Sequence, residues 1–213
     1  MPNSAPHPDT PGGDGTERAA AAATCAAPQA TDLRPFMAAF PSGVTVVTAL
    51  DTGGLPRGMT CSSMTSVALD PPTLVVCLRT ASPTLQALLE QGQFAVNLLH
   101  EQARATSDLF ASGAPDRFDR VGWRLPLGAS GPHLTSSAHA IADCTVVKTA
   151  AFGDHTAVFA QARRVSVHPT IRPLLYGLRR YAEWSAAASG PPPAALPLPP
   201  RPAPAEGAAR VRS

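Results

Sequence analysis

TLVVCLRTASPTLQALLEQGQFAVNLL, residues 73–99, contains two strand-like segments separated by one short helix-forming segment. Residues 73–79 and 93–99 are rich in Val and Leu, which is typical of buried strands. The segment between them begins with Ser82, a residue type that caps helix N-termini, and ends at Gly92, a residue type that follows helix C-termini. The stretch therefore predicts a strand, a short helix and a second strand.

The chain on both sides of this stretch favours further strands. Strand-like segments cover GVTVVTAL (43–50), RGMTCSSMTSVAL (57–69), AIADCTVVKTA (140–150) and HTAVFAQARRVSV (155–167). One more helix is expected within HEQARATSDLFAS (100–112), where Leu and Phe fall on one face. Most links between strands are short, and strands do not alternate regularly with helices. We therefore expect a mainly β fold with a few helices, an antiparallel barrel rather than a doubly wound sheet.

Composition limits the classes of partner. The 213 residues carry a formal net charge of +2 and 44% of them are hydrophobic, which suits one domain with an ordinary core. The arginines are scattered, so no nucleic-acid surface is indicated, and no apolar run is long enough to span a bilayer. The four cysteines lack C-x-x-C spacing and are expected to be mostly buried thiols in a reducing cytoplasm.

The two terminal segments differ in composition from the middle of the chain. From Pro2 to Asp32 there is no Val, Ile, Leu, Phe, Tyr or Trp, and residues 185–213 are rich in Pro and Ala. Such segments cannot bury enough apolar surface to offset the entropy lost on ordering. We therefore expect disordered tails over 1–32 and 185–213 and one folded domain over 33–184. The Ala/Pro/Arg-rich tails also suit a bacterial source with a GC-rich genome.

Common catalytic motifs are absent. No G-x-G-x-x-G follows a strand, and neither a G-x-x-x-x-G-K-[ST] loop nor a G-x-S-x-G turn is present. No two of the six histidines have metal-ligand spacing on a helix, so no metal is expected. His133 and His139 are expected in an exposed loop, and PDRFDR (115–120) is expected to form a solvated charged turn.

Small hydroxyl side chains are dense in the first half of the predicted domain. They crowd MTCSSMTS (59–66), and Ser82 with Thr84 opens the helix that follows Arg79. Thr is a good strand former and Ser a good cap, but so many small hydroxyls in one strand give up packing. A phosphorylated ligand would explain them, because the free N–H groups and the dipole of a helix N-terminus attract phosphate.

Several segments, in order, resemble one family. FPSGVTVVTAL (40–50), GMTCSSMTSVALDPPTLVVCL (58–78), SPTLQALLEQGQFAVNLL (82–99), FGDHTAVFAQARRV (152–165) and PLLYGLRRY (173–181) are similar to the short-chain flavin reductase domain. Such domains are the reductase components of two-component flavin-dependent monooxygenases. The resemblance covers about residues 33–184. It implies a split β-barrel of antiparallel strands that binds FMN or FAD and forms a homodimer, with sites near the subunit interface.

The resemblance also implies the site residues. The flavin-contacting strand of the family falls on Gly58, Thr60 and Ser63, with Met59, Ser62 and Ser66 beside them. The residues that would hold the phosphate are Arg79, Ser82 and Thr84. Phe94 and Asn97 match a motif that lies along the flavin, and Gly153, Asp154 and His155 match a motif that borders the flavin and nicotinamide. Tyr176 and Tyr181 match two tyrosines that are often near the partner's site.

Function follows from the same resemblance. It implies an NAD(P)H:flavin oxidoreductase that supplies reduced flavin by diffusion to a partner monooxygenase. Hydride transfer needs stacking and orientation rather than a strong base, so we expect His155 to position the nicotinamide. Two alternatives stay open, a non-catalytic flavin-binding or scaffold dimer and a pyridoxamine-phosphate-oxidase-like flavoenzyme. The residues also leave open FMN or FAD, NADH or NADPH, and the identity of the monooxygenase.

Overall fold

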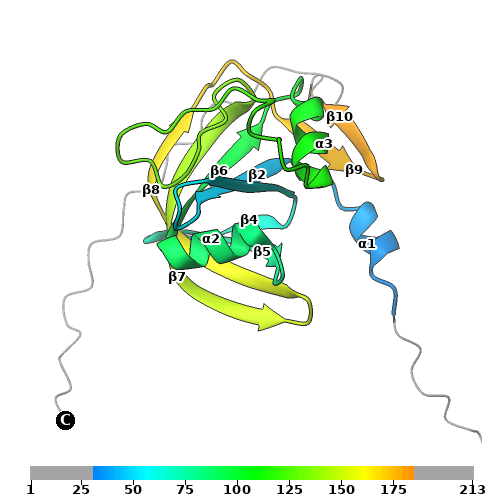
Figure 1. The fold of residues 1–213 in the computed structure, drawn as a ribbon. Helices are drawn as coiled ribbons and strands as arrows, with labels where there is room; N and C mark the ends of the chain where they lie inside the picture. Colours follow the sequence, from blue (N-terminus) through cyan, green and yellow to red (C-terminus); the bar gives the residue numbers. More distant parts are fainter. Residues whose placement is uncertain (1–30, 185–213) are drawn as a thin grey trace, which may run out of the picture. The chain divides into compact units, whose positions relative to one another are not determined.

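The computed structural model describes residues 31–184, and that part of the chain contains ten strands and three helices (Figure 1). The strands are β1 Ser42–Gly43, β2 Thr45–Leu50, β3 Pro56–Cys61, β4 Met64–Leu69, β5 Pro72–Arg79, β6 Gln93–Leu99, β7 Ala138–Phe152, β8 His155–Val167, β9 Leu174–Gly177 and β10 Arg180–Glu183. The helices are α1 Arg34–Ala38, α2 Pro83–Gln91 and α3 Arg104–Ser112. The predicted tails lie outside the described residues, apart from Thr31 and Asp32. Within residues 31–184, no helix is long and apolar enough to cross a membrane.

Most of the predicted elements are confirmed. β6 and β8 have the predicted bounds, and α2 begins after an N-cap at Ser82 and ends before Gly92, whose φ is 66°. The segment 57–69, predicted as one strand, is divided into β3 and β4 because residues 62 and 63 leave the strand. α1 and the hairpin of β9 and β10 were not predicted as elements, since all three are only four or five residues long.

The order of the strands explains why the main sheet closes. Seven antiparallel strands follow one another in the order β3-β2-β6-β7-β8-β5-β4. β3 and β4 stand at opposite ends of this order, yet only Ser62 and Ser63 separate them in the sequence. The sheet must therefore curl until its ends meet at a seam, the two-residue link between β3 and β4. Beside this seam the Cys77 N–H of β5 donates to the Ser63 carbonyl at 3.1 Å, which extends the β4–β5 pairing into the link. The predicted split β-barrel is confirmed.

Two apolar clusters lie on the two faces of β2. Val47 faces the first cluster, which also holds Val76 of β5 and Leu88 of α2. Val46 faces the second cluster, which holds Phe110 of α3. Because both faces of β2 are covered, its residues are buried on both sides, Thr45 and Thr48 included, rather than buried and exposed in alternation. α2 packs on β2, β3 and β6, and α3 packs on β3 and β2, so the two helices flank β3.

A second, smaller sheet has the order β1-β9-β10. β9 pairs with β1 and β10 in antiparallel fashion, and the Val44 N–H donates to the Leu174 carbonyl at 3.1 Å. The segment after β8 is therefore fastened to the start of β2. This arrangement brings the C-terminal tyrosines next to α3.

Candidate active site

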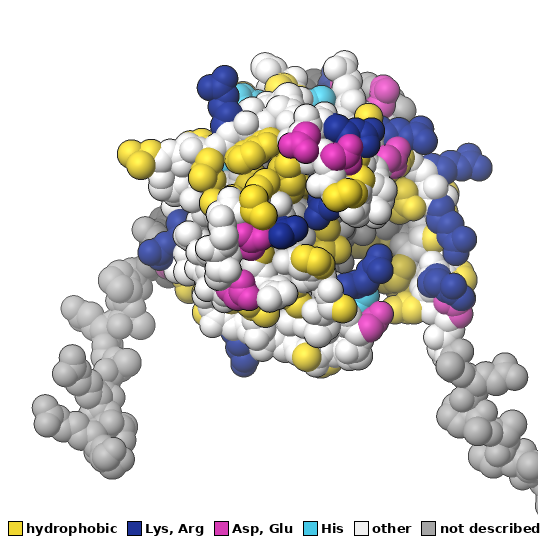
Figure 2. Space-filling model, viewed as in Figure 1, with side chains coloured by type: hydrophobic (Ala, Val, Ile, Leu, Met, Phe, Trp, Pro, Cys, Tyr) yellow, Lys and Arg dark blue, Asp and Glu magenta, His cyan; other side chains and the backbone are white. Residues whose placement is uncertain are grey.

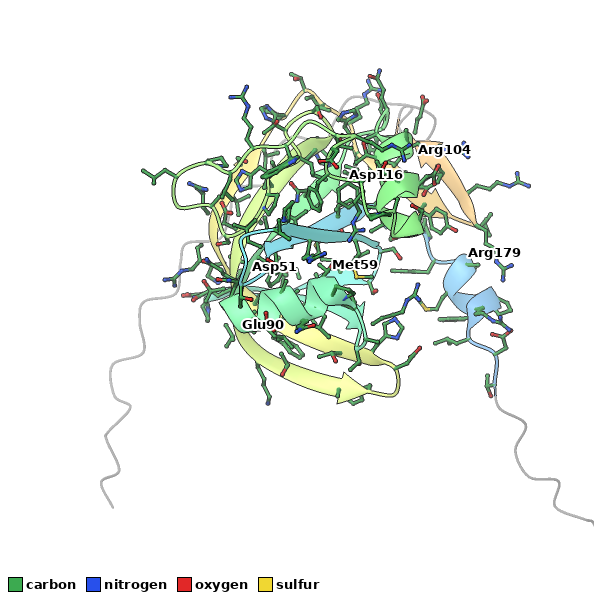
Figure 3. The ribbon with its side chains drawn as sticks, in the orientation of Figure 1. Asp51, Met59, Glu90, Arg104, Asp116 and Arg179 are labelled. Carbon is green, nitrogen blue, oxygen red and sulfur yellow. The ribbon has the colours of Figure 1, made fainter. Side chains whose placement is uncertain are left out.

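A cavity of about 530 Å³ lies between α2, α3 and β3. Its lining comes from residues 57–60 of β3, from the β5–α2 link within 79–84, and from the end of α3 with the following loop within 110–117. Met59 lies between the two helices in Figure 3, and on the face shown in Figure 2 Lys and Arg side chains border a hollow. The volume is typical of a site for a small organic ligand or cofactor.

Among the described residues 31–184, three arginines and no acidic side chain line this cavity. Arg57 is neutralised, because its Nε and Nη2 donate to Asp51 Oδ2 at 3.0 and 2.8 Å. Arg117 donates instead to backbone carbonyls, from Nε to Gly58 at 3.0 Å and from Nη1 to Ala114 at 2.7 Å. Burial lowers the pKa of Arg117 and the nearby Arg57 lowers it further, but a guanidinium stays protonated in proteins. The cavity is therefore electropositive.

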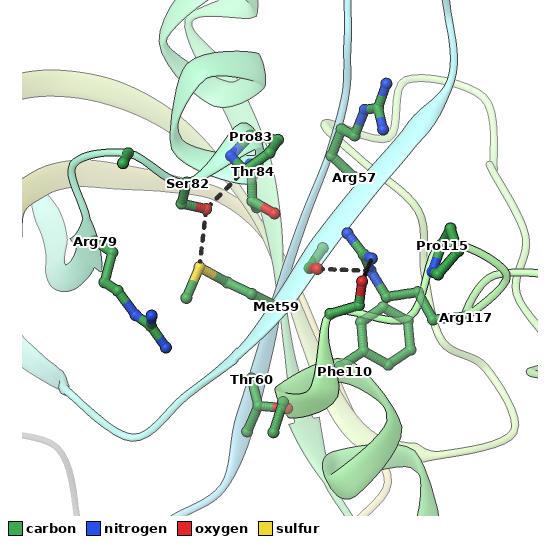
Figure 4. A pocket seen from close by; sticks show the side chains of 14 residues that line it. Arg57, Met59, Thr60, Arg79, Ser82, Pro83, Thr84, Phe110, Pro115 and Arg117 are labelled. Carbon is green, nitrogen blue, oxygen red and sulfur yellow. Dashed lines mark hydrogen bonds between the residues drawn. The ribbon is translucent and has the colours of Figure 1, made fainter.

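The start of α2 forms one end of the cavity. Ser82 Oγ accepts from the Thr84 N–H at 3.1 Å and the Leu85 N–H at 3.4 Å, and donates to Met59 Sδ at 3.2 Å (Figure 4). The cap therefore already accepts from these N–H groups, and the capture of a phosphate at this helix N-terminus stays a prediction. The ligand-facing groups at this end are Arg79, Thr84 and the helix dipole.

β3 forms the wall of the cavity through Gly58, Met59 and Thr60. A Cβ at Gly58 would lie 2.9 Å from Phe110 Cε1 and 3.0 Å from Phe118 Cζ, so the glycine is required by the packing of α3 and the loop after it. Thr60 Oγ1 donates to the Ser107 carbonyl of α3 at 2.7 Å. Two of these three predicted flavin contacts thus also hold α3 against the barrel.

Three of the predicted serines lie away from the cavity lining. Ser62, Ser63 and Ser66 are exposed. Ser63 Oγ donates to the Cys77 carbonyl at 3.3 Å, which reinforces the barrel seam. Ser62 borders a separate depression of about 180 Å³, which His139 also lines. The structure therefore does not place these three serines in the lining of the cavity that Arg79 lines.

Phe94 and Asn97 lie in the protein interior and neither lines the cavity, and their predicted place along the flavin stays a prediction. Consecutive strand residues point to opposite faces, which directs Phe94 into the barrel interior and Asn97 toward a covering loop. Asn97 Nδ2 donates to the Pro132 carbonyl at 3.3 Å, and its Oδ1 accepts from the Leu134 N–H at 2.8 Å. Asn97 therefore fastens that loop to the barrel.

The Gly-Asp-His motif lies at the tip of the β7–β8 hairpin. Gly153, with φ of 58°, and Asp154 form the turn, and His155 is the first residue of β8. His155 stands directly opposite Arg79 in the pairing of β8 with β5, and such partners share a face of the sheet. His155 Nδ1 lies 2.8 Å from Asp154 Oδ1, and this hydrogen bond lowers the pKa of Asp154. The motif thus lies beside the cavity residue Arg79, although none of its three residues lines the cavity.

The two predicted tyrosines pack against each other, with ring centroids 5.2 Å apart. The Tyr181 hydroxyl donates to Asp108 Oδ1 at 2.8 Å and lies 3.0 Å from Ser107 Oγ. These contacts join the β9–β10 hairpin to α3. Neither Tyr176 nor Tyr181 lines the cavity within this chain.

Sequence reasoning missed two cavity arginines and one buried histidine. Arg57 lies in a segment predicted only to be strand-like, and Arg117 lies in a segment predicted to be a solvated turn. The structure places both in the cavity lining. His133, predicted to be exposed, is buried, and its Nε2 donates to Asp143 Oδ1 at 2.9 Å. The spacing of the two residues in the sequence does not by itself indicate that Asp143 is the partner of His133.

Comparison with known proteins agrees with this geometry. Residues 37–185 match the family model of the flavin reductase like domain. A flavin reductase (NADPH) of Lentzea aerocolonigenes is 46% identical over 160 residues, covering 73% of this chain and 91% of that protein. A flavin reductase (NADH) of Kitasatospora aureofaciens is 41% identical over 150 residues, covering 70% of this chain and 78% of that protein.

Two solved structures are similar in fold. The NADH:FAD oxidoreductase SgcE6 of Streptomyces globisporus C-1027, in complex with NAD and FAD fragments, has a TM-score of 0.67 at 30% identity, covering 73% of this chain and 96% of that chain. The styrene monooxygenase flavin reductase of Pseudomonas putida S12 has a TM-score of 0.64 at 32% identity, covering 71% of this chain and 96% of that chain. The chain therefore belongs to the flavin reductase like domain family.

Proposed function

We propose that this chain is an NAD(P)H:flavin oxidoreductase that reduces FMN or FAD and supplies reduced flavin to a partner monooxygenase. The observation that carries the proposal is the cavity beside β3, which three arginines and no acidic side chain line in a chain of this family. The similar proteins include an NADPH and an NADH flavin reductase and the reductase of a styrene monooxygenase.

The residues present fit a flavin with a phosphate. Arg79 supplies charge at the α2 end of the cavity, and Thr84, which also lines this end, supplies a hydroxyl. Met59 and the Gly58 backbone offer an apolar wall along β3. When bound, flavin supplies the hydride acceptor, while the protein supplies position and polarity. The absence of an acidic side chain from the lining suits a hydride transfer that needs no protein base.

His155 is proposed to position the nicotinamide. It lies opposite Arg79 at the edge of the cavity, and its side chain is exposed and therefore accessible to a second ligand. His155 Nδ1 is hydrogen-bonded to Asp154 Oδ1, so His155 Nε2 is the ring nitrogen left to face that ligand.

We also propose a homodimer in a reducing compartment such as the cytoplasm. Phe36 of α1, Phe40 after it and Leu69 of β4 are exposed to 72%, 65% and 81%, and exposed apolar surface marks interaction sites. The thiols of Cys61, Cys77 and Cys144 are free, as in most cytosolic proteins. Light scattering tests the dimer: we expect the mass of two chains, and a Phe36→Glu, Phe40→Glu variant with the mass of one chain.

A spectrophotometric assay tests the activity. Purified protein is mixed with NADH or NADPH, with and without FMN or FAD, and the nicotinamide absorbance is followed. We expect the absorbance to fall and the rate to increase with added flavin. Flavin binding without loss of nicotinamide absorbance would contradict the proposal and would favour the non-catalytic scaffold.

A further inference from the structure

The cavity has two cationic ends. Arg79 lies at the α2 end and Arg117 at the end formed by the loop after α3, and Figure 4 shows them on opposite sides of Met59. Arg57, the third arginine, is neutralised by Asp51. Two guanidinium groups therefore remain to attract anions from two sides of one cavity.

The bonding of Arg117 leaves one part of its guanidinium for a ligand. Nε donates to the Gly58 carbonyl, and Nη1 donates to the carbonyls of Gly113 and Ala114. Within residues 31–184, the hydrogen bonds of Arg117 come from Nε and Nη1 alone, and none comes from Nη2. Carbonyls orient the group without cancelling its charge, and a partly buried charge without a counter-ion favours an anionic partner.

One phosphate does not account for both ends. The α2 end, with Arg79 and Thr84, suffices for the single phosphate of FMN. The Arg117 end then faces the same cavity with no carboxylate in the lining to neutralise it. A ligand that carries a diphosphate would place negative charge toward both ends.

We propose that the Arg117 end binds the diphosphate of an adenosine diphosphate group, which FAD and NAD(P)H contain and FMN lacks. This assignment rests on the proposed function and makes it more specific. It distinguishes the ligands of one cavity by their charge, because FAD and NAD(P)H contain a diphosphate and FMN does not. Arg117 is then a specificity-determining residue, and Arg79 serves every phosphorylated flavin.

Equilibrium binding to the full chain tests this inference. Riboflavin, FMN, FAD, NADH and ADP are titrated into wild type, Arg117→Met and Arg79→Met by fluorescence or calorimetry. A hydrogen bond between charged groups is worth about 1.5–3 kcal/mol, so Arg117→Met should weaken ADP binding by about 10- to 100-fold. The affinity for FAD or for NADH, whichever ligand uses this end, should fall by the same factor. The affinity for FMN should change by less than about twofold. Arg79→Met should weaken both FMN and FAD.

Further variants separate binding from folding. Arg117→Lys keeps the charge and should retain part of the ADP affinity, and riboflavin binding reports whether the cavity is intact in each variant. Arg120→Met is the matched control, because Arg120 is in the same loop, is 58% exposed and lies 3.8 Å from Asp116. It should leave all five affinities unchanged.

Two results would overturn the inference. One is ADP binding to Arg117→Met as tightly as to wild type, and the other is an equal loss of FMN, FAD and ADP affinity. If wild type consumes NADH with added flavin but gives either result, only the inference fails. If wild type never consumes the reductant, the proposed function itself fails.

Discussion

Arg117 and Asp143 are both partly or fully buried charges, but the protein satisfies them in different ways. Asp143 is 2% exposed and accepts hydrogen bonds from His133 Nε2 at 2.9 Å, from the Ser130 N–H at 2.7 Å and from Arg164 Nε at 2.8 Å. Arg117 donates to uncharged carbonyls. The carboxylate is thus compensated by a cation, and the guanidinium is not.

The difference separates a structural charge from a ligand-binding one. The compensated Asp143 joins β7 to the loop that contains Ser130 and His133, so its bonds hold the covering loop in place. Arg117 is held by carbonyls at the end of α3, and its charge remains directed to the cavity. The experiments below test this division, beginning with the largest expected effect.

Replacing Asp143 should destabilise the fold without changing the chemistry of the cavity. Asp143→Ala leaves Ser130 and His133 without their acceptor, and loss of one partner of a buried ion pair costs about 3–5 kcal/mol. Because Arg164 is 46% exposed, we expect a smaller loss of unfolding free energy, about 2–4 kcal/mol, in urea unfolding. Asp116→Ala is the control, because Asp116 belongs to an exposed ion pair. It should change the unfolding free energy by less than about 0.5 kcal/mol. Equal stabilities of the two variants would contradict a structural role for Asp143.

Acid should weaken the same contacts. Burial alone would raise the pKa of Asp143, but hydrogen bonds from His133, Ser130 and Arg164 outweigh it and hold the pKa below its ordinary value. A carboxyl whose folded-state pKa is lowered stabilises the fold fully above its ordinary pKa, about 3.9. That stabilisation is lost as pH falls through the folded-state value. We compare the unfolding free energies of wild type and Asp143→Asn in urea, from neutral pH to pH about 3. The difference between them should become smaller as pH falls. A difference that stays constant would contradict a lowered pKa for Asp143.

Gly58→Ala should damage the wall that orients Arg117. The new Cβ would meet the rings of Phe110 and Phe118, and overpacking of this kind costs about 1–3 kcal/mol. We expect lower thermal stability together with weaker flavin binding, because α3 must shift from β3. Gly43→Ala is the control, since a Cβ there meets nothing within 4 Å. Normal flavin binding in Gly58→Ala would show that the α3 contact does not shape the cavity.

His155→Ala should have the smallest effect. If His155 positions the nicotinamide through one hydrogen bond worth about 1 kcal/mol, the Michaelis constant for the dinucleotide should rise about fivefold. Flavin affinity should change little, because Arg79, the residue proposed to bind the phosphate, is unchanged. His168→Ala, at an exposed histidine just after β8, is the matched control for loss of an imidazole. An unchanged Michaelis constant for His155→Ala would remove the positioning role.

Much of the fold could be predicted because its signals are local. Strand segments are apolar and β-branched, and the ends of α2 are marked by Ser82 and Gly92. Six of the predicted site residues, Gly58, Met59, Thr60, Arg79, Ser82 and Thr84, line one cavity. They come from two segments, β3 and the β5–α2 link, which the barrel brings together.

The sequence by itself determined most strands of the main sheet, the helices α2 and α3, the family and the cationic residue Arg79 at the end of β5. Only the tertiary structure decided which polar residues serve a ligand. Asn97 and His133 hold a loop, while Arg117 of an ordinary-looking charged turn faces the cavity. The reason is physical: the compensation of a charge depends on its partners, and those of Asp143 come from β8 and from the loop before β7, so only the folded arrangement of these segments brings them together.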